Sequence, residues 1–111
     1  MKLQLKNEWC EALRSGKYKQ CKNVLSNGEA YCCLGVLAKV AGLEELPDNS
    51  SNRPRFRTHY GVIYDMFPEE YLKELGLREV YQDKLVELND TKQKNFNEIA
   101  DYIEEYVPCS D

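Results

Sequence analysis

The sequence has no apolar run that approaches the roughly 18 residues a helix needs to cross a bilayer. At its start, Asn7 and Glu8 come before the apolar segment of a secretion signal could form. Internal repeats and low-complexity tracts are missing, and so are the familiar catalytic and cofactor motifs. These absences exclude a membrane-spanning class. We expect a cytoplasmic protein with no membrane partner and no cofactor.

Cysteine is present, but not in a pattern that binds zinc or forms a disulfide framework. The five cysteines are an odd number, and no two of them are spaced as a CxxC pair. We therefore expect reduced thiols, as in a cytosolic protein, and no metal site.

Composition places the chain among folded single-domain proteins. With 111 residues, of which 42% are apolar and 31% charged, it is long enough to bury a core without disulfides or metals. Charge is divided unequally: residues 1–59 contain ten Lys and Arg against six acids, whereas residues 60–111 contain five against thirteen. The net charge of −4 argues against nucleic acid as the main partner. We expect the two halves to attract each other.

Periodicity predicts one small α+β domain over residues 1–111, mainly helical, with about five helices and one β-hairpin. Apolar spacing and end signals place the helices at about 7–15, 33–42, 68–76, 80–90 and 95–107. In the second of these, Lys39 is the only charged residue, so we expect a buried central helix.

Turn and loop signals complete this prediction. Asn27-Gly28 is a strong two-residue turn signal and predicts a β-hairpin near residues 23–32. Residues 44–58 contain two prolines and a polar cluster, which predict an irregular basic loop.

Four segments of the chain resemble a family of small uncharacterised proteins encoded by bacteriophages and prophages. They are WCEALRSGKYKQ, YCCLGVLAKVAG, LND and FNEIADYIEEYV, which fit the patterns W-x-x-A-L-R-S-G-x-Y-x-Q, Y-C-C-L-G-V-L, L-N-D and F-x-x-I-A-D-Y-I-E. The likeness covers most of the chain outside residues 44–67. It implies a phage-encoded protein that works in a bacterial host, and it implies no particular reaction.

The adjacent Cys32 and Cys33 allow two roles. A nucleophilic thiol needs a base within hydrogen-bonding reach, and His59 is the only imidazole in the chain. Asp65 or Asn89 would then orient that imidazole. The simpler interpretation is that both thiols pack as small apolar groups where a strand leads into a helix. We expect packing, with a cysteine-dependent hydrolase or transferase as the alternative.

Two basic segments that contain tyrosine are the sharpest functional signal. In RPRFRTHY the arginines alternate, which places them on one side of an extended chain. Arginine forks beside aromatic rings suit a phosphate and a stacked base, as in a nucleotide. The alternative is a solvated surface that pairs with the acidic half of the chain. From RSGKYKQCK and RPRFRTHY, the candidate ligand-binding residues are Arg14, Lys17, Tyr18, Gln20, Arg53, Arg55, Arg57 and Tyr60.

Trp9, Asn89 and Asp90 each allow a structural and a ligand-binding role. Trp9 repeats at helical spacing with Leu13, which predicts a core position over one that stacks on a base. Asn89 and Asp90 are predicted to cap the turn between the last two helices, although both side chains have the groups to orient a ligand.

These features favour a small phage-encoded cytosolic accessory protein that acts by binding. Its partner would be a nucleotide-type signal or a host defence protein, so the expected role is counter-defence. Two alternatives stay open. One is the cysteine-dependent enzyme, and the other is an interaction module that binds a host regulator through the acidic helices at 80–107.

Overall fold

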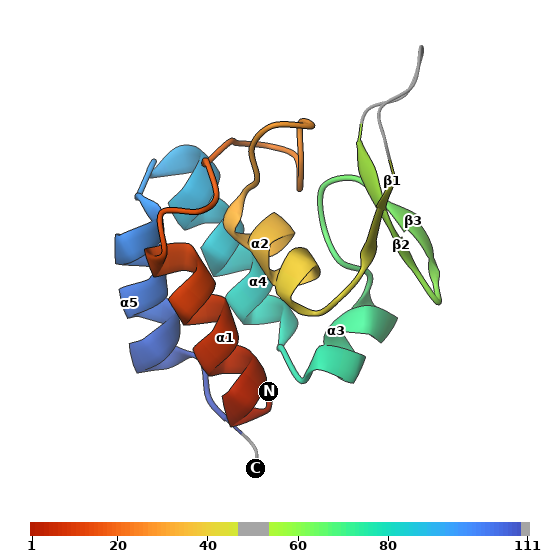
Figure 1. Ribbon diagram of the computed structural model, residues 1–111. Helices are drawn as coiled ribbons and strands as arrows, with labels where there is room; N and C mark the ends of the chain where they lie inside the picture. The colour runs from red at the N-terminus through yellow and green to blue at the C-terminus, as the bar shows by residue number, and fades with distance from the viewer. Residues whose placement is uncertain (47–53, 110–111) are drawn as a thin grey trace.

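The computed structural model describes residues 1–46 and 54–109 (Figure 1). Within these residues it contains five α-helices, one π-helical turn and one three-stranded antiparallel sheet. The expected α+β class with five helices is confirmed. Figure 1 shows α1, α2, α4 and α5 grouped together, with the sheet on the other side of the molecule beside α3. No helix within the described residues is long and apolar enough to span a membrane. In chain order the elements are α1 (Leu3–Arg14), α2 (Cys33–Val40), β1 (Glu44–Leu46), β2 (Arg55–Thr58), β3 (Gly61–Ile63), α3 (Glu69–Leu75), α4 (Glu79–Val86), the π-helical turn η1 (Glu87–Thr91) and α5 (Phe96–Tyr106).

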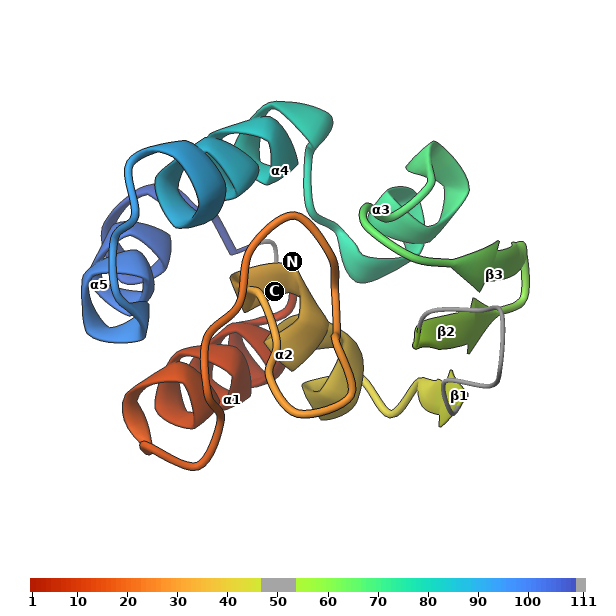
Figure 2. The same ribbon diagram turned by 90° about the horizontal axis from the view of Figure 1, so that it is seen from above.

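Helix α2 forms the centre of the core. Its residues from Cys33 to Ala38 are all buried, because this stretch has no charged side chain. Figure 2 shows α2 between α1 and α4, and α2 packs against both. Trp9 of α1 is fully buried, and its indole N–H donates to the carbonyl oxygen of Cys33 at 3.0 Å. The core position predicted for Trp9 is therefore confirmed.

The α1–α2 loop (residues 15–32) lies across α2, as Figure 2 shows. Leu25 of this loop is fully buried, and its carbonyl oxygen accepts the N–H of Cys32 at 3.3 Å. A Cβ atom at Gly35 would lie only 1.9 Å from that carbonyl oxygen. Glycine is therefore required at this position of the buried helix because the loop backbone approaches so closely.

The β-hairpin predicted near residues 23–32 is wrong, although the chain does turn at Asn27. The side-chain Oδ1 of Asn27 accepts two backbone N–H groups, at 2.9 and 2.7 Å. Beyond the turn, Tyr31 makes only isolated bridges, to Ser26 and to Gln20, and no strand forms. Leu25 of this segment is fully buried in the core, and no ladder extends beyond the isolated bridges.

The antiparallel sheet lies instead within residues 44–63, so the irregular loop predicted over 44–58 is wrong at both of its ends. β2 occupies the middle of the sheet and pairs with β1 on one side and β3 on the other. Residues 47–53, which include Arg53, lie outside the described part of the chain. Two of these strands have only three residues and one has four, which leaves little local signal for a strand.

The two faces of the sheet differ in polarity. Phe56 and Ile63 are paired across β2 and β3 and are buried against the helices. Arg55 and Arg57 alternate with Phe56 and therefore project from the opposite face. The hairpin joining β2 and β3 turns at His59 and Tyr60.

The helix ends agree closely with the sequence pattern at α3 and at α5. Helix α3 stops before Gly76, whose φ of +74° suits the glycine predicted to end it. By contrast, α1 begins at Leu3, upstream of the predicted start near residue 7. Helix α4 ends at Val86 and continues as the wider turn η1, which the sequence does not announce.

Replacing Gly35 by alanine is expected to destabilise the protein by about 2–3 kcal/mol or more, because the added methyl group overlaps the Leu25 carbonyl. Helix propensity alone favours alanine over glycine by about 1 kcal/mol, so the sign of the change separates the two effects. The measurement is the free energy of unfolding in urea. Gly16→Ala is the control, since its Cβ would have nothing within 4 Å and only the positive φ of +75° opposes it. A Gly35→Ala protein as stable as the parent would contradict the close approach.

Candidate binding surface

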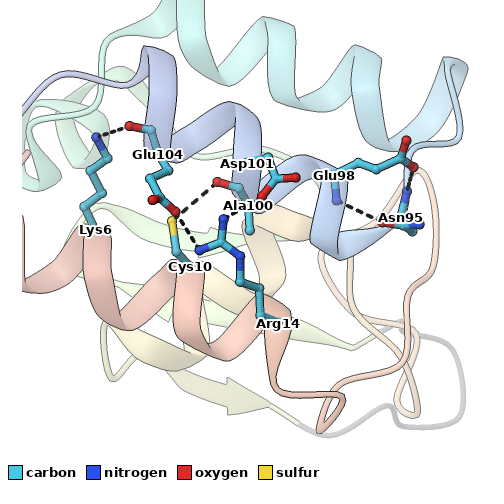
Figure 3. A network of polar contacts seen from close by, with 8 residues as sticks. All are labelled: Lys6, Cys10, Arg14, Asn95, Glu98, Ala100, Asp101 and Glu104. Atoms are coloured by element: carbon cyan, nitrogen blue, oxygen red, sulfur yellow. Dashed lines mark hydrogen bonds and ion pairs between the residues drawn. The ribbon is translucent and has the colours of Figure 1, made fainter.

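Arg14, a candidate ligand contact, is engaged in ion pairs within the molecule, at its surface. It ends α1, and its guanidinium pairs with Oδ1 of Asp101 and Oε2 of Glu104 of α5, both at 2.7 Å (Figure 3). The hydrogen bonds that the guanidinium donates to the two carboxylates raise the pKa of Arg14. Nearby, Nζ of Lys6 donates to the carbonyl oxygens of Val107 at 2.6 Å and Glu104 at 3.1 Å. Here the basic half of the sequence pairs with the acidic half, as expected for a solvated surface rather than a ligand site.

Gln20 is also held internally, by the π-helical turn. Its Nε2 donates to Oδ1 of Asn89 at 2.9 Å and to the carbonyl oxygen of Lys94 at 2.8 Å. Asn89 is only 1% exposed, its Oδ1 also accepts the N–H of Cys33 at 3.3 Å, and its Nδ2 donates to the Cys21 carbonyl at 2.9 Å. Asn89 therefore caps α2, rather than the turn between α4 and α5 where the sequence places it. Sequence reasoning also missed its link to Gln20.

Cys32 and Cys33 are buried at the N-terminal end of α2. Burial raises the pKa of Cys32 to about 12 and that of Cys33 well above its usual value. His59 instead lines a groove beside Ala41 and Gly42, which follow the C-terminal end of α2. At a rise of 1.5 Å per residue, α2 separates Cys33 from Ala41 by about 12 Å. The structure therefore does not bring His59 to either thiol.

Metal ligands are not gathered either. Across residues 1–46 and 54–109, no group of three or more His, Cys, Asp or Glu side chains is arranged to hold a metal ion. All five cysteines are free thiols, and only Cys109 is exposed.

Lys17 and Tyr18 belong to a series of contacts that reaches the sheet. Nζ of Lys17 lies 5.7 Å from the centre of the Tyr18 ring. That ring packs edge-on against Tyr31, with the ring centres 5.5 Å apart. The Tyr31 hydroxyl donates to Oε1 of Glu45 in β1 at 2.8 Å. The loop that carries these two candidate residues is thus joined to the sheet.

Glu45 is the polar centre of this region. Besides Tyr31, it accepts hydrogen bonds from Oγ of Ser26 at 2.7 Å and from Nζ of Lys39 at 3.3 Å. Burial raises the pKa of Glu45, but the three hydrogen bonds lower it more, so the net pKa is below its usual value. Burial and the bond to Glu45 raise the pKa of Tyr31 to about 12. Sequence reasoning missed Glu45, because its partners come from α2 and the α1–α2 loop.

Arg57 and Tyr60 lie on the exposed hairpin of β2 and β3. Nε of Arg57 pairs with Oε1 of Glu44 at 3.2 Å, and the two side chains are 60% and 65% exposed. Tyr60 is 47% exposed, and its hydroxyl donates to Oε1 of Glu74 in α3 at 3.2 Å. Arg55 lies on the same strand face as Arg57. Of the candidate ligand-binding residues, these three share one hairpin.

Exposed apolar side chains occur on this hairpin and in the chain just after it. Val62 is 42% exposed and pairs directly with Arg57 across the strands, and Met66 is 38% exposed. Three of the six exposed large apolar side chains in the described residues fall between positions 60 and 66. We call Arg57, Tyr60, Val62 and Met66 the hairpin surface. Sequence reasoning missed Val62 and Met66, because GVIYDMF reads equally as a strand or as a buried turn.

A groove of about 330 Å³ borders the hairpin surface. Its walls come from the residues that follow α2, from the sheet and from α3, and we call it the α2–α3 groove. Its lining residues with a basic or acidic side chain are Glu44, Arg57, His59 and Glu74, and Tyr71 lines it as well. With two carboxylates and one guanidinium, this groove does not offer the net positive charge that a phosphate group prefers.

These features define a small α+β protein with exposed apolar side chains on a hairpin, beside a groove lined by two carboxylates and one guanidinium. The chain belongs to the family described as a domain of unknown function (DUF8296), whose model matches residues 1–73. The match includes α1, α2, the sheet and most of α3, and therefore the whole hairpin surface. No curated protein and no solved structure matches the chain.

Replacing Asn89 by alanine is expected to destabilise the protein by about 2–4 kcal/mol, because three buried or half-buried groups each lose one hydrogen bond. Asn95→Ala is the control, since it removes only the cap of α5 and should cost about 1 kcal/mol. Urea unfolding measures both. A loss no larger for Asn89→Ala than for Asn95→Ala would show that Asn89 does not hold the loop to α2.

Alkylation of the folded protein is expected to modify Cys109 rapidly and the other four cysteines slowly. Cys109 is exposed, whereas burial keeps the pKa of Cys32 near 12 and therefore keeps its thiol protonated at neutral pH. The measurement is iodoacetamide labelling mapped by mass spectrometry, with Cys109→Ser as the variant that loses the rapid phase. Labelling of Cys32 or Cys33 as fast as Cys109 would support the cysteine-dependent enzyme instead.

Proposed function

We propose that this protein acts by binding a host protein through the hairpin surface, as a small phage-encoded accessory protein with a counter-defence role in the bacterial cytoplasm. The observation that carries the proposal is the exposure of Tyr60 and Val62 on the hairpin, where Val62 pairs with Arg57, and of Met66 just after β3. Tyrosine, methionine and arginine are enriched in protein interfaces, and tyrosine and arginine often dominate their affinity. Large apolar side chains grouped at the surface mark interaction sites.

The biological setting of this proposal comes from the sequence. Its four phage-like segments supply the expectation of a bacterial host, and a family of unknown function is compatible with it. A binding role needs no catalytic group, which agrees with the burial of Cys32 and Cys33 and with their distance from His59. An exposed docking surface is then the feature on which activity depends.

A nucleotide-type ligand is the second candidate, and a groove of about 310 Å³ lined by Lys17 and Tyr18 favours it. Glu8 and Glu11 line the same groove, however, and their carboxylates repel phosphate. Arg14, which would help to balance them, is paired with α5. The protein partner is therefore the better supported proposal.

Photocrosslinking from two exposed tyrosines tests the proposal. Tyr60 on the hairpin is 47% exposed and Tyr106 on α5 is 56% exposed, so each position accepts benzoylphenylalanine with similar ease. On illumination of bacterial cells, we expect one discrete protein adduct from position 60 and at least about tenfold less from position 106. Adding Val62→Asp should remove the adduct, because a buried charge at an interface centre costs more than the roughly 1.4 kcal/mol that corresponds to tenfold in affinity.

Two outcomes would contradict the proposal. One is an equal adduct at both tyrosines, and the other is no adduct at position 60. Native mass spectrometry with added nucleotides, including signalling dinucleotides, decides the second candidate. A retained nucleotide without an adduct at position 60 would instead support nucleotide binding in the groove lined by Lys17 and Tyr18.

A further inference from the structure

The α2–α3 groove indicates the chemistry of the segment that the hairpin surface binds. Its volume of about 330 Å³ is at the lower end of the range for small-molecule sites, about 300–1,000 Å³. A groove of this size accommodates one long side chain better than a dinucleotide. It also adjoins the hairpin surface directly, because Arg57 lines both and Tyr60 is hydrogen-bonded to Glu74 of the groove.

Negative charge dominates this groove. The positive charge of Arg57 offsets the negative charge of Glu44, with 3.2 Å between Nε of Arg57 and Oε1 of Glu44. No ion pair within residues 1–46 and 54–109 involves Glu74. Desolvation, the hydrogen bond to Glu74 and the charges of Glu74 and Glu70 raise the pKa of Tyr60. The C-terminal end of α2 adds the partial negative charge of a helix dipole. A cation is therefore the favoured guest.

The residues beside the groove suit a long basic side chain. The Tyr60 ring is exposed next to the Glu74 carboxylate, so a guanidinium or ammonium group paired with Glu74 also lies against an aromatic ring. Val62 continues the same surface with an exposed apolar group. Charge and apolar contact are thus offered side by side.

We propose that the partner docks a segment with one Arg or Lys whose charged end enters the α2–α3 groove between Glu44 and Glu74, and with a neighbouring apolar side chain that covers Tyr60 and Val62. This inference rests on the proposed function and adds the chemical class of the partner. The basic residue supplies specificity, and the apolar residue supplies the buried area.

The test is selection of a displayed library of random peptides on the immobilised 111-residue chain. We expect the enriched peptides to carry Arg or Lys beside an apolar residue and to compete with the Tyr60 adduct. Their Kd, measured by fluorescence anisotropy, should be at least about tenfold weaker for the double variant Glu44→Gln and Glu74→Gln. The matched control is Glu29→Gln with Glu105→Gln, which removes two exposed carboxylates elsewhere and should leave Kd within about twofold. Circular dichroism confirms that both variants are folded.

An acidic or uncharged consensus, a selection that enriches no peptide, or equal Kd values for the two double variants would overturn the inference. If the adduct from Tyr60 is still specific, the proposed function stands and the partner has a different chemistry. If that adduct is also absent, the proposed function fails together with the inference.

Discussion

The position of α2 at the centre of the protein depends on the contact between Gly35 and the carbonyl group of Leu25. Because glycine has no side chain, the α1–α2 loop can lie directly on the buried helix. Leu25 is then fully buried, and its N–H donates to the carbonyl oxygen of Tyr64 at 2.8 Å, just after β3. This one close approach therefore joins the loop, the central helix and the chain that follows the sheet.

Two polar side chains hold this arrangement at opposite ends of α2. Asn89 of η1 binds the first turn of the helix and the loop, while Glu45 of β1 binds Lys39 near its end and two loop side chains. The buried side-chain nitrogen and oxygen atoms of the described residues all have hydrogen-bond partners. A loop without regular strands is stable here because its polar groups are satisfied by neighbouring elements.

This internal bonding determines which residues are left for a partner. Arg14 pairs with α5, and Gln20 is hydrogen-bonded to Asn89 and Lys94. The polar groups of both side chains are therefore engaged within the molecule. The hairpin surface differs, because its apolar groups are exposed and the side chain of Arg57 is itself 60% exposed. Exposed apolar area beside a groove with excess negative charge is the combination from which the proposed binding role and the basic partner are inferred.

The sequence alone determined the features that depend on neighbouring residues. These are the buried character of α2, the glycine end of α3 and the turn at Asn27. It did not locate the sheet, because strands of three or four residues are stabilised mainly by packing on distant elements. Nor did it show that Val62 is exposed, or that Arg14 and Gln20 are engaged. Their partners Asp101 and Asn89 are 87 and 69 residues away, and only the tertiary structure brings such distant groups within hydrogen-bonding reach.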